Sequence, residues 1–324
     1  MKAALVLPAD DMSKRKRIIK YSIFIFAIFV VGSIIFSAYI YKPKEYTEFQ
    51  SEYLAINSTQ YTQLENYNAH FFKKGAGDTV ILVHGGGSWL YSYKNNINPL
   101  SEYFEVHALD MPGHGYTIAV SEPIYNLDTY ADFIYMFMEM QQIEKASFVG
   151  HSWGGGWATY FAMKYPDKVD KLILIASSGL NLPDKSEWRY LNYPVLGEII
   201  ANFISLNATK NSLEDMVCDS DFVTDLYAKE IFAPISKPNN RRAQYLSQRN
   251  MNWKITDERM RELNHRTLLI FGDNDPYFEI EYANQFNDRL ESSTLVTIKN
   301  FGHLPHEENY EEVNKMMIEF LLNH

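Results

Sequence analysis

The sequence predicts an α/β domain: a mostly parallel sheet with helices on both faces, carrying a helical insertion and preceded by one apolar helix. Three features of its 324 residues predict this fold class. Short apolar runs alternate with helical patterns, a glycine-flanked serine separates one such run from a helix, and a long uncharged stretch lies near the N-terminus.

The uncharged stretch covers residues 21–41, which are 21 positions without a charged side chain. A helix needs about 20 apolar residues to cross the hydrocarbon core of a membrane. Basic residues are more numerous before the stretch (Lys14, Arg15, Lys16, Arg17, Lys20) than closely after it (Lys42, Lys44). The positive-inside bias therefore predicts a cytoplasmic segment over 1–17, a transmembrane signal anchor over 18–41, and an extracytoplasmic domain held at the cell membrane.

The composition excludes several kinds of partner and scaffold. The net charge is −10 and no cluster of Lys and Arg recurs after the N-terminus, so we expect no nucleic-acid partner. Cys218 is the only cysteine, which excludes an intrachain disulfide and a thiolate-based metal cluster. The composition does not determine the oligomeric state.

Short apolar runs recur along the chain from residue 79 onward. Runs this short and this apolar are typical of strands buried on both faces of a parallel sheet. They are TVILVHGGG (79–87), FEVHALDMPG (104–113), ASFVGHS (146–152), KLILIASSG (171–179), RTLLIFGD (266–273) and STLVTIKN (293–300). Two earlier segments, YLAINSTQY (53–61) and AHFFKKG (69–75), predict two opening strands.

Helical patterns separate several of these strands. Residues 127–143 have helical apolar spacing, with Asp128 as a candidate cap, and residues 154–166 follow the glycine-flanked serine and stop at Pro166. Residues 309–324 close the chain as an amphipathic helix. The alternation breaks over 179–265, which is too long for a structureless loop because such loops rarely exceed about 15 residues.

We interpret residues 179–265 as a mostly helical lid over the carboxyl ends of the strands, where ligands bind in open α/β sheets. The core then consists of residues 42–178 and 266–324. Large apolar side chains are frequent in the lid. They suit an apolar acyl chain or ring, so we expect a small apolar ester or other acyl compound as the substrate.

The chemistry is predicted by the stretch Gly150-His151-Ser152-Trp153-Gly154. In a G-x-S-x-G turn between a strand and a helix, the serine hydroxyl is held in the open as a nucleophile. Such a hydroxyl needs a base, and the base needs an acid that orients it. Two later strand ends offer both, with Asp273 and Asp275 after one strand and His303 and His306 after the next.

These motifs resemble the α/β-hydrolase superfamily over roughly residues 50–324. The matching segments are HGGG (84–87), DMPGHG (110–115), GHSWGG (150–155), GDNDP (272–276) and GH (302–303). The resemblance implies an eight-stranded, mostly parallel sheet with a lid, as in lidded esterases and epoxide hydrolases. It assigns the acid to Asp275 and the base to His303. Dehalogenases and epoxide hydrolases carry Asp at the position of Ser152, so the sequence departs from both.

The resemblance also implies an oxyanion hole and a cofactor-free mechanism. One donor is the N–H of Trp153, the residue after the nucleophile, and the other comes from the HGGG loop, at Gly86 with Gly87 as the alternative. His303 takes the Ser152 proton, an acyl-enzyme forms, and water releases the product. We expect no metal and no organic cofactor.

The motifs define the substrate less closely than they define the reaction. We expect His151, Trp188, Tyr193 and Trp253 to line its pocket. Hydrolysis of a carboxylic ester is the first hypothesis. A peptidase similar to proline iminopeptidases and a carbon–carbon bond hydrolase are alternatives from the same superfamily. A non-catalytic binding protein on the same fold is a further alternative, although such proteins usually lose a member of the triad.

Overall fold

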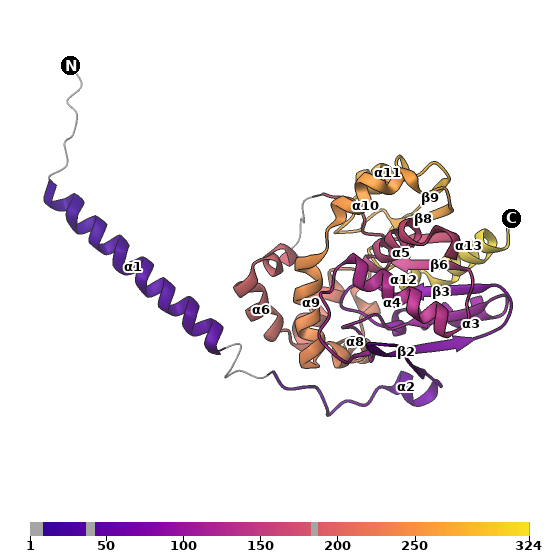
Figure 1. Ribbon diagram of the computed structural model, residues 1–324, viewed down its shortest axis with the longest axis horizontal. Coiled ribbons are helices and arrows are strands. Elements are labelled where there is room, and N and C mark those ends of the chain that lie inside the picture. Colours follow the sequence, from indigo (N-terminus) through magenta and orange to yellow (C-terminus); the bar gives the residue numbers. More distant parts are fainter. Residues whose placement is uncertain (1–8, 37–42, 183–186, 324) are drawn as a thin grey trace, which may run out of the picture.

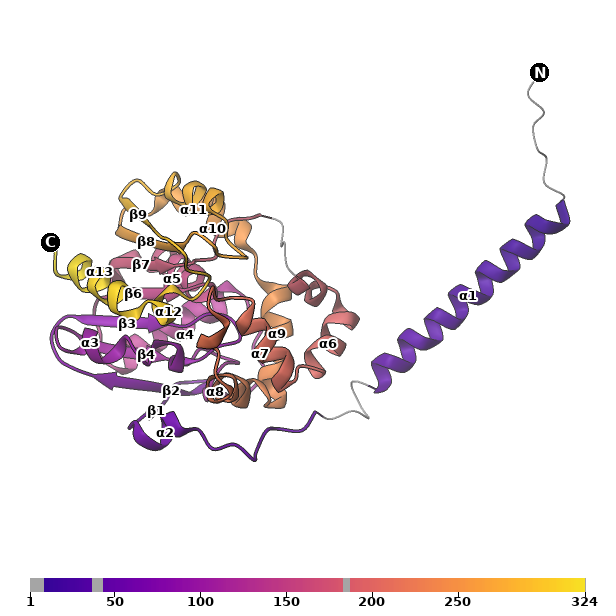
Figure 2. The same ribbon diagram turned by 180° about the vertical axis from the view of Figure 1, so that it is seen from behind.

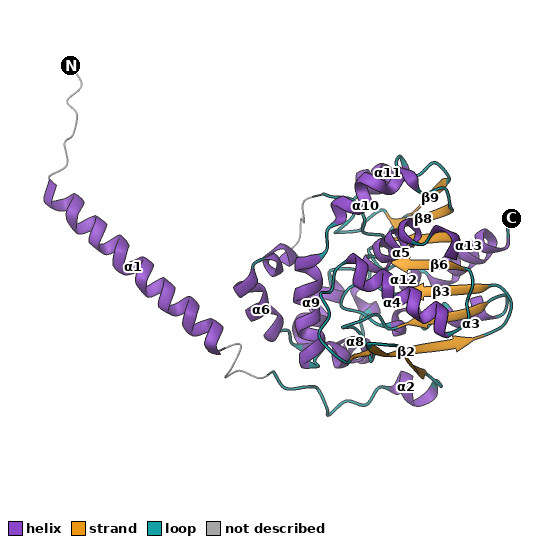
Figure 3. Cartoon of the chain, viewed as in Figure 1, coloured by secondary structure: helices purple, strands orange, loops and turns teal. Residues whose placement is uncertain are grey.

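The computed structural model describes residues 9–36, 43–182 and 187–323 of the chain (Figure 1). Within these ranges one sheet forms the centre of the molecule and helices cover its two faces (Figure 3). The main path of the sheet has the strand order β1-β2-β4-β3-β6-β7-β8-β9, and a two-residue strand, β5, pairs with β2. This is the fold class that the sequence predicts.

The strands from β4 to β9 are parallel, and β1 and β2 join the edge antiparallel. Their bounds are β1 Gln60–Gln63, β2 Tyr67–Lys74, β3 Thr79–Val83, β4 Glu105–Leu109, β5 Ile118–Ala119, β6 Ala146–His151, β7 Val169–Ile175, β8 Arg266–Gly272 and β9 Ser293–Ile298. In β3, Ile81 and Val83 belong to one apolar cluster and Val80 and Leu82 to the other, because successive side chains point to opposite faces.

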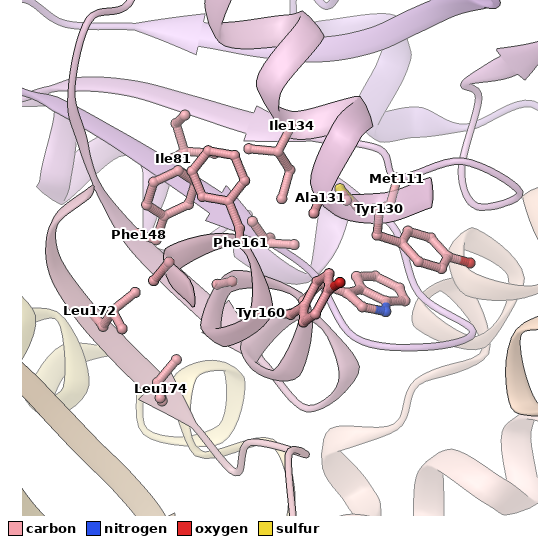
Figure 4. Packing of buried hydrophobic residues seen from close by; sticks show 14 of the residues in the cluster. Ile81, Met111, Tyr130, Ala131, Ile134, Phe148, Tyr160, Phe161, Leu172 and Leu174 are labelled. Atoms are coloured by element: carbon pink, nitrogen blue, oxygen red, sulfur yellow. The ribbon is translucent and has the colours of Figure 1, made fainter. Parts of the chain in front are cut away.

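Each face of the sheet is covered by its own helices. The first cluster packs α4 (Leu127–Met140), α5 (Trp153–Lys164) and α11 (Ile280–Asn287) on the sheet, and Figure 4 shows Ile134 and Phe161 meeting Phe148 of β6 there. The second cluster packs α3 (Ile97–Ser101), α8 (Asp225–Ile235) and α13 (Tyr310–Leu322) on the other face.

The first predicted strand is wrong in its first half. The segment 53–61 instead begins within α2 (Glu52–Ile56), and β1 starts only at Gln60. Ser51 explains the difference, since its hydroxyl accepts a hydrogen bond from the N–H of Leu54 and caps a short helix. The apolar residues of 53–56 are compatible with a strand or a helix, and the cap formed by Ser51 favours the helix.

The insertion between β7 and β8 is helical, as expected. Its α-helices are α6 (Pro194–Asn202), α7 (Leu206–Glu214), α8, α9 (Pro238–Asn250) and α10 (Trp253–Arg259). Short 3-10 turns lie at Glu187–Asn192, Ser220–Phe222 and Met260–Glu262, and others outside the insertion at Leu90–Tyr93 and Pro166–Lys168. A last short helix, α12 (Pro305–Glu308), precedes α13.

Helix α1 (Ala9–Ile35) extends away from the domain (Figure 1). Within its segment Lys14–Ile35, the most apolar 18-residue stretch has a mean hydropathy of 2.4, and by length and composition the helix could cross a membrane. Residues 37–41, the end of the predicted anchor, lie outside the described residues.

Candidate active site

Ser152 occupies a sharp turn between the last residue of β6, His151, and the first residue of α5, Trp153. Its backbone has φ 51° and ψ −120°, a region that residues with a side chain rarely adopt. The neighbouring backbone holds it there. The Ser152 N–H donates to the carbonyl of Ile175 (3.0 Å), and its own carbonyl accepts from Gly155 and Ser178 (3.0 Å each).

The glycines of the turn have a packing reason. A Cβ on Gly150 would lie 2.6 Å from the carbonyl oxygen of Gly154, and a Cβ on Gly154 would lie 2.2 Å from that of Val83. Helix α5 therefore approaches β6 and β3 more closely than any other residue at these positions would allow. This close approach sets the direction in which the turn presents Ser152.

Asp275 and His303 are joined across two loops. His303 Nδ1 donates a hydrogen bond of 2.8 Å to Asp275 Oδ2, and both residues are buried. The other carboxylate oxygen of Asp275 accepts from the backbone N–H groups of Tyr277 (2.8 Å) and Phe278 (3.0 Å). With Nδ1 as the donor, Nε2 of the neutral ring carries the free lone pair that a general base needs.

The two alternative residues lie in different surroundings. Asp273 accepts a hydrogen bond of 2.6 Å from the N–H of Asn300 and so ties two loops together. The His306 ring is fully buried, and within the described structure neither of its nitrogens has a hydrogen-bond partner, although Nε2 lies 4.0 Å from the carboxylate of Glu307. Burial, followed by the charge of Lys94, lowers the pKa of His306 to about 3. A ring that stays neutral and enclosed is a poor general base.

Within the described residues, the Ser152 hydroxyl makes no hydrogen bond to the His303 ring. In enzymes without substrate this contact is often long and tightens on binding. The His303 ring itself is enclosed by the rings of His151 (4.9 Å between centroids), Tyr277 (5.0 Å) and Phe278 (5.5 Å). The catalytic roles of Ser152, Asp275 and His303 therefore stay predictions.

His151 lies beneath the base. Its Nε2 donates to the backbone carbonyl of His303 (2.9 Å), and its ring faces that of His306 at 4.5 Å. Burial, and then the neighbouring His306 and His303, hold the pKa of His151 well below its ordinary value. His151 is only 4% exposed, so its contacts are those of a residue that positions His303, and its place in the pocket wall stays a prediction.

The HGGG loop packs directly on the elbow. A Cβ on Gly86 would lie 2.4 Å from the indole of Trp153, so only glycine fits there. His84 holds the loop, because its Nδ1 donates to the carbonyl of Gly85 (2.8 Å) and its Nε2 accepts from the N–H of Met111 (3.0 Å). Among the described residues, neither the N–H of Gly86 nor that of Trp153 donates a hydrogen bond, which leaves both available to an oxyanion.

The DMPGHG turn is organised by a buried carboxylate. Asp110 accepts hydrogen bonds from the N–H groups of Leu90 (2.7 Å) and Tyr116 (2.8 Å), and lies 2.6 Å from Nδ1 of His70. All three of these contacts hold the Asp110 carboxylate inside the protein. Asp110 therefore stabilises the loops beside the site.

Sequence reasoning missed one residue, Gln244 of α9. Its side-chain Oε1 is buried without a hydrogen-bond partner in the described structure, and it lies 3.6 Å from the position of a Cβ on Gly87. The lid thus places an unsatisfied amide beside the predicted oxyanion loop. No local signal marks this glutamine, because it is one polar residue in a polar helical segment and its neighbour comes from residue 87.

The predicted pocket residues of the lid differ in their surroundings. Trp253 is half-buried against α5, where a Cβ on Gly156 would meet its ring at 2.4 Å. Tyr193 is 60% exposed, next to α6. The side chain of Trp188 lies outside the described residues. Among the described residues, no three His, Cys, Asp or Glu side chains gather as they would around a metal ion.

Comparison with known proteins identifies the fold. Residues 78–198 match the model of the α/β hydrolase fold. Over 282 residues the chain is 27% identical to the 2-hydroxy-6-oxononadienedioate/2-hydroxy-6-oxononatrienedioate hydrolase of Comamonas testosteroni, covering 84% of this chain and 96% of that one.

Solved structures agree. A meta-cleavage product hydrolase from Pseudomonas fluorescens IP01 is 25% identical with a TM-score of 0.72, over 81% of this chain and 97% of that one. A membrane phospholipase A is 20% identical with a TM-score of 0.68, a likeness of fold that covers 97% of this chain and 98% of that one. The chain has the α/β-hydrolase fold and is similar to hydrolases of the α/β-hydrolase superfamily, with Ser152 at the turn between β6 and α5.

Proposed function

We propose that this hydrolase cleaves an acyl bond in a small apolar substrate through an acyl-enzyme on Ser152. The observation that carries the proposal is the buried hydrogen bond from His303 to Asp275, beside a serine in a strained turn. Strain of this kind persists only where the surroundings impose it, and it is concentrated at functional sites.

The steps follow from the positions of the groups. Nε2 of His303 accepts the Ser152 proton while Oγ attacks the substrate carbonyl, and the N–H groups of Gly86 and Trp153 receive the negative charge. His303 then protonates the leaving group, and a water molecule attacks the acyl-enzyme with His303 again as base. Asp275 keeps the imidazole oriented and stabilises its protonated form.

The bond that is cleaved defines two candidate functions. Carboxylic-ester hydrolysis is the first, because an alcohol is the least demanding leaving group for this machinery. Carbon–carbon bond hydrolysis is the second, and the relative named for 2-hydroxy-6-oxononadienedioate favours it. In that reaction the leaving group departs as a stabilised carbanion that His303 must protonate on carbon.

A fluorophosphonate probe tests the nucleophile in the full-length chain. We expect the probe to label Ser152, and Ser152→Ala to abolish both labelling and ester turnover. Ser121→Ala, the same change at an exposed serine, is the matched control and should leave both intact. Labelling of a folded Ser152→Ala variant to the same extent would refute the proposal. Rates on a p-nitrophenyl ester and on 2-hydroxy-6-oxononadienedioate then separate the two candidates.

The proposal includes the anchor. Residues 18–41 cross the cell membrane, 1–17 stay in the cytoplasm, and the core (42–178 and 266–324) and lid (179–265) lie outside. Cys218 is exposed and is the only cysteine, so it reports the topology. Burial raises the pKa of its thiol, so labelling is done near pH 8. We expect a membrane-impermeant maleimide to label Cys218 in intact cells. Labelling only after lysis would indicate the opposite orientation.

A further inference from the structure

Helix α6 of the lid turns its large apolar side chains outward. Its inner face consists of small residues, Gly197 and Ala201, and a Cβ on Gly197 would lie 2.4 Å from the carbonyl oxygen of Leu191. On the outside, Leu196 is 43% exposed and Ile200 is 38% exposed. Phe203, one turn further along, is 52% exposed. We call Leu196, Ile200 and Phe203 the α6 face.

This polarity is the reverse of an ordinary surface helix, whose apolar stripe faces the core and whose polar residues face water. The charge pattern agrees. Glu198 is the only charged residue of α6, and its carboxylate pairs with Arg242 at 2.9 Å. A contiguous exposed apolar face without an unpaired charge is typical of a surface that contacts another protein or a membrane.

The position of helix α1 favours a membrane as the contact of this face. It contacts α6, and both ribbon views show its C-terminal end beside that helix (Figures 1 and 2). Two grooves lie between them. They are lined on α1 by Phe29, Gly32, Ser33, Ile34 and Phe36. On the lid they are lined by the apolar Pro194, Val195, Ile199, Phe203 and Leu246 and by the polar Glu198, Arg242, Tyr245 and Arg249. Phe203 of the α6 face lines the second groove, so the α6 face adjoins the surface of the proposed membrane span.

The depth of the contact is consistent with a membrane interface. At 1.5 Å per residue, Phe29 to Phe36 covers about 10 Å along the helix. A helix that lies in the interface buries its apolar side about 5–10 Å into the boundary between headgroups and acyl chains. If residues 18–41 span the bilayer with their C-terminal end outside, α6 lies beside the outer half of that span.

We propose that the α6 face docks on the lipid bilayer, so that the lid lies in the outer membrane interface beside α1. The inference rests on the proposed anchor, and it deepens the proposed function, since a lid in the interface favours acyl substrates dissolved in the lipid. The occupant of the α6 face is phospholipid.

Depth-dependent quenching tests the docking in the full-length chain. In a Cys218→Ser background, Ile200→Cys is labelled with an environment-sensitive fluorophore and reconstituted in phosphatidylcholine–phosphatidylglycerol vesicles. Tyr103→Cys is the matched control, because Tyr103 is 49% exposed on the turn before β4, away from α6. We expect brominated lipids to quench the label at 200 and aqueous iodide to quench the label at 103.

Two results would overturn the proposal. If iodide reaches the label at 200 as readily as the label at 103, the α6 face is exposed to water. If the label at 200 is shielded from both quenchers, a second copy of the chain covers the face. Neither result depends on turnover, so a failure of docking is distinguishable from a failure of the Ser152 chemistry.

An activity measurement completes the test. The double variant Leu196→Gln and Ile200→Gln should hydrolyse a short soluble ester at the parent rate and lose severalfold activity on a long-chain ester dissolved in the vesicles. An equal loss on both substrates would mean that the variant damages the lid and would count against docking. Absence of turnover in the parent chain on either ester would refute the proposed function and leave the quenching result to decide docking.

Discussion

The turn at Ser152 and helix α6 both depart from ordinary folding rules, in opposite ways. At the turn the backbone is unfavourable, with a non-glycine residue at φ 51°, and hydrogen bonds from β7 and α5 hold it in place. In α6 the backbone is regular, and the unfavourable feature is the solvent exposure of Leu196 and Ile200. The interior of the protein compensates the first departure, whereas only a partner outside the domain can compensate the second.

The largest expected effect lies at the turn. Asp275→Asn should lower kcat about 10⁴-fold, because the amide no longer holds the His303 tautomer, with little change in unfolding. The assay is turnover of a soluble ester, with Asp273→Asn as the matched control. A larger loss of activity in Asp273→Asn than in Asp275→Asn would indicate that Asp273 is the acid that orients His303.

The two faces of α6 should respond differently to truncation and enlargement. Gly197→Ala places a methyl group 2.4 Å from the Leu191 carbonyl, and we expect it to destabilise the protein by about 1–3 kcal/mol. Leu196→Ala removes atoms from the exposed side and should stay within about 0.5 kcal/mol in detergent. Urea unfolding measures both. Comparable losses would indicate that Leu196 packs on the lid interior.

The buried histidines near the turn predict a pH dependence of stability. Burial lowers the pKa of His306 to about 3, whereas the unfolded chain binds the proton near pH 6.5. The unfolded state therefore takes up protons first, and stability falls as the pH falls from about 6.5 towards 3. His306→Phe should reduce that slope by about 1.4 kcal/mol per pH unit near pH 5. An unchanged slope would mean that the native ring is also protonated there.

The smallest expected effect concerns the strain itself. Ser152→Gly should be more stable than Ser152→Ala by about 1 kcal/mol, because glycine adopts φ 51° without a steric penalty. Both variants lack the nucleophile, so they differ only in stability and the comparison of their unfolding is direct. Equal midpoints of unfolding would show that the turn stores no strain.

Much of the fold followed from local patterns. The strands β3, β4, β6, β7 and β8 are the buried apolar runs that the sequence predicts, and α5 ends at Lys164, just before Pro166. The expectation of burial is wrong for β9, which forms the edge of the sheet and buries only Ile298. The error at 53–56 arose where a five-residue helix depends on one capping hydroxyl. The strand ends offered two aspartates and two histidines, and the resemblance to the superfamily selected Asp275 and His303. The 2.8 Å hydrogen bond between them is the contact that this choice requires.

Local patterns were enough to predict the α/β-hydrolase fold, the turn with its serine, and a helix apolar enough to span a membrane, because each depends on residues close together in the chain. Tertiary structure alone decided which contacts residues far apart would make. It placed His151 beneath His303, Gln244 beside the HGGG loop and helix α6 against α1. The physical reason is that periodicity defines which residues share a face of a helix, while the surface that this face meets depends on how the whole chain packs.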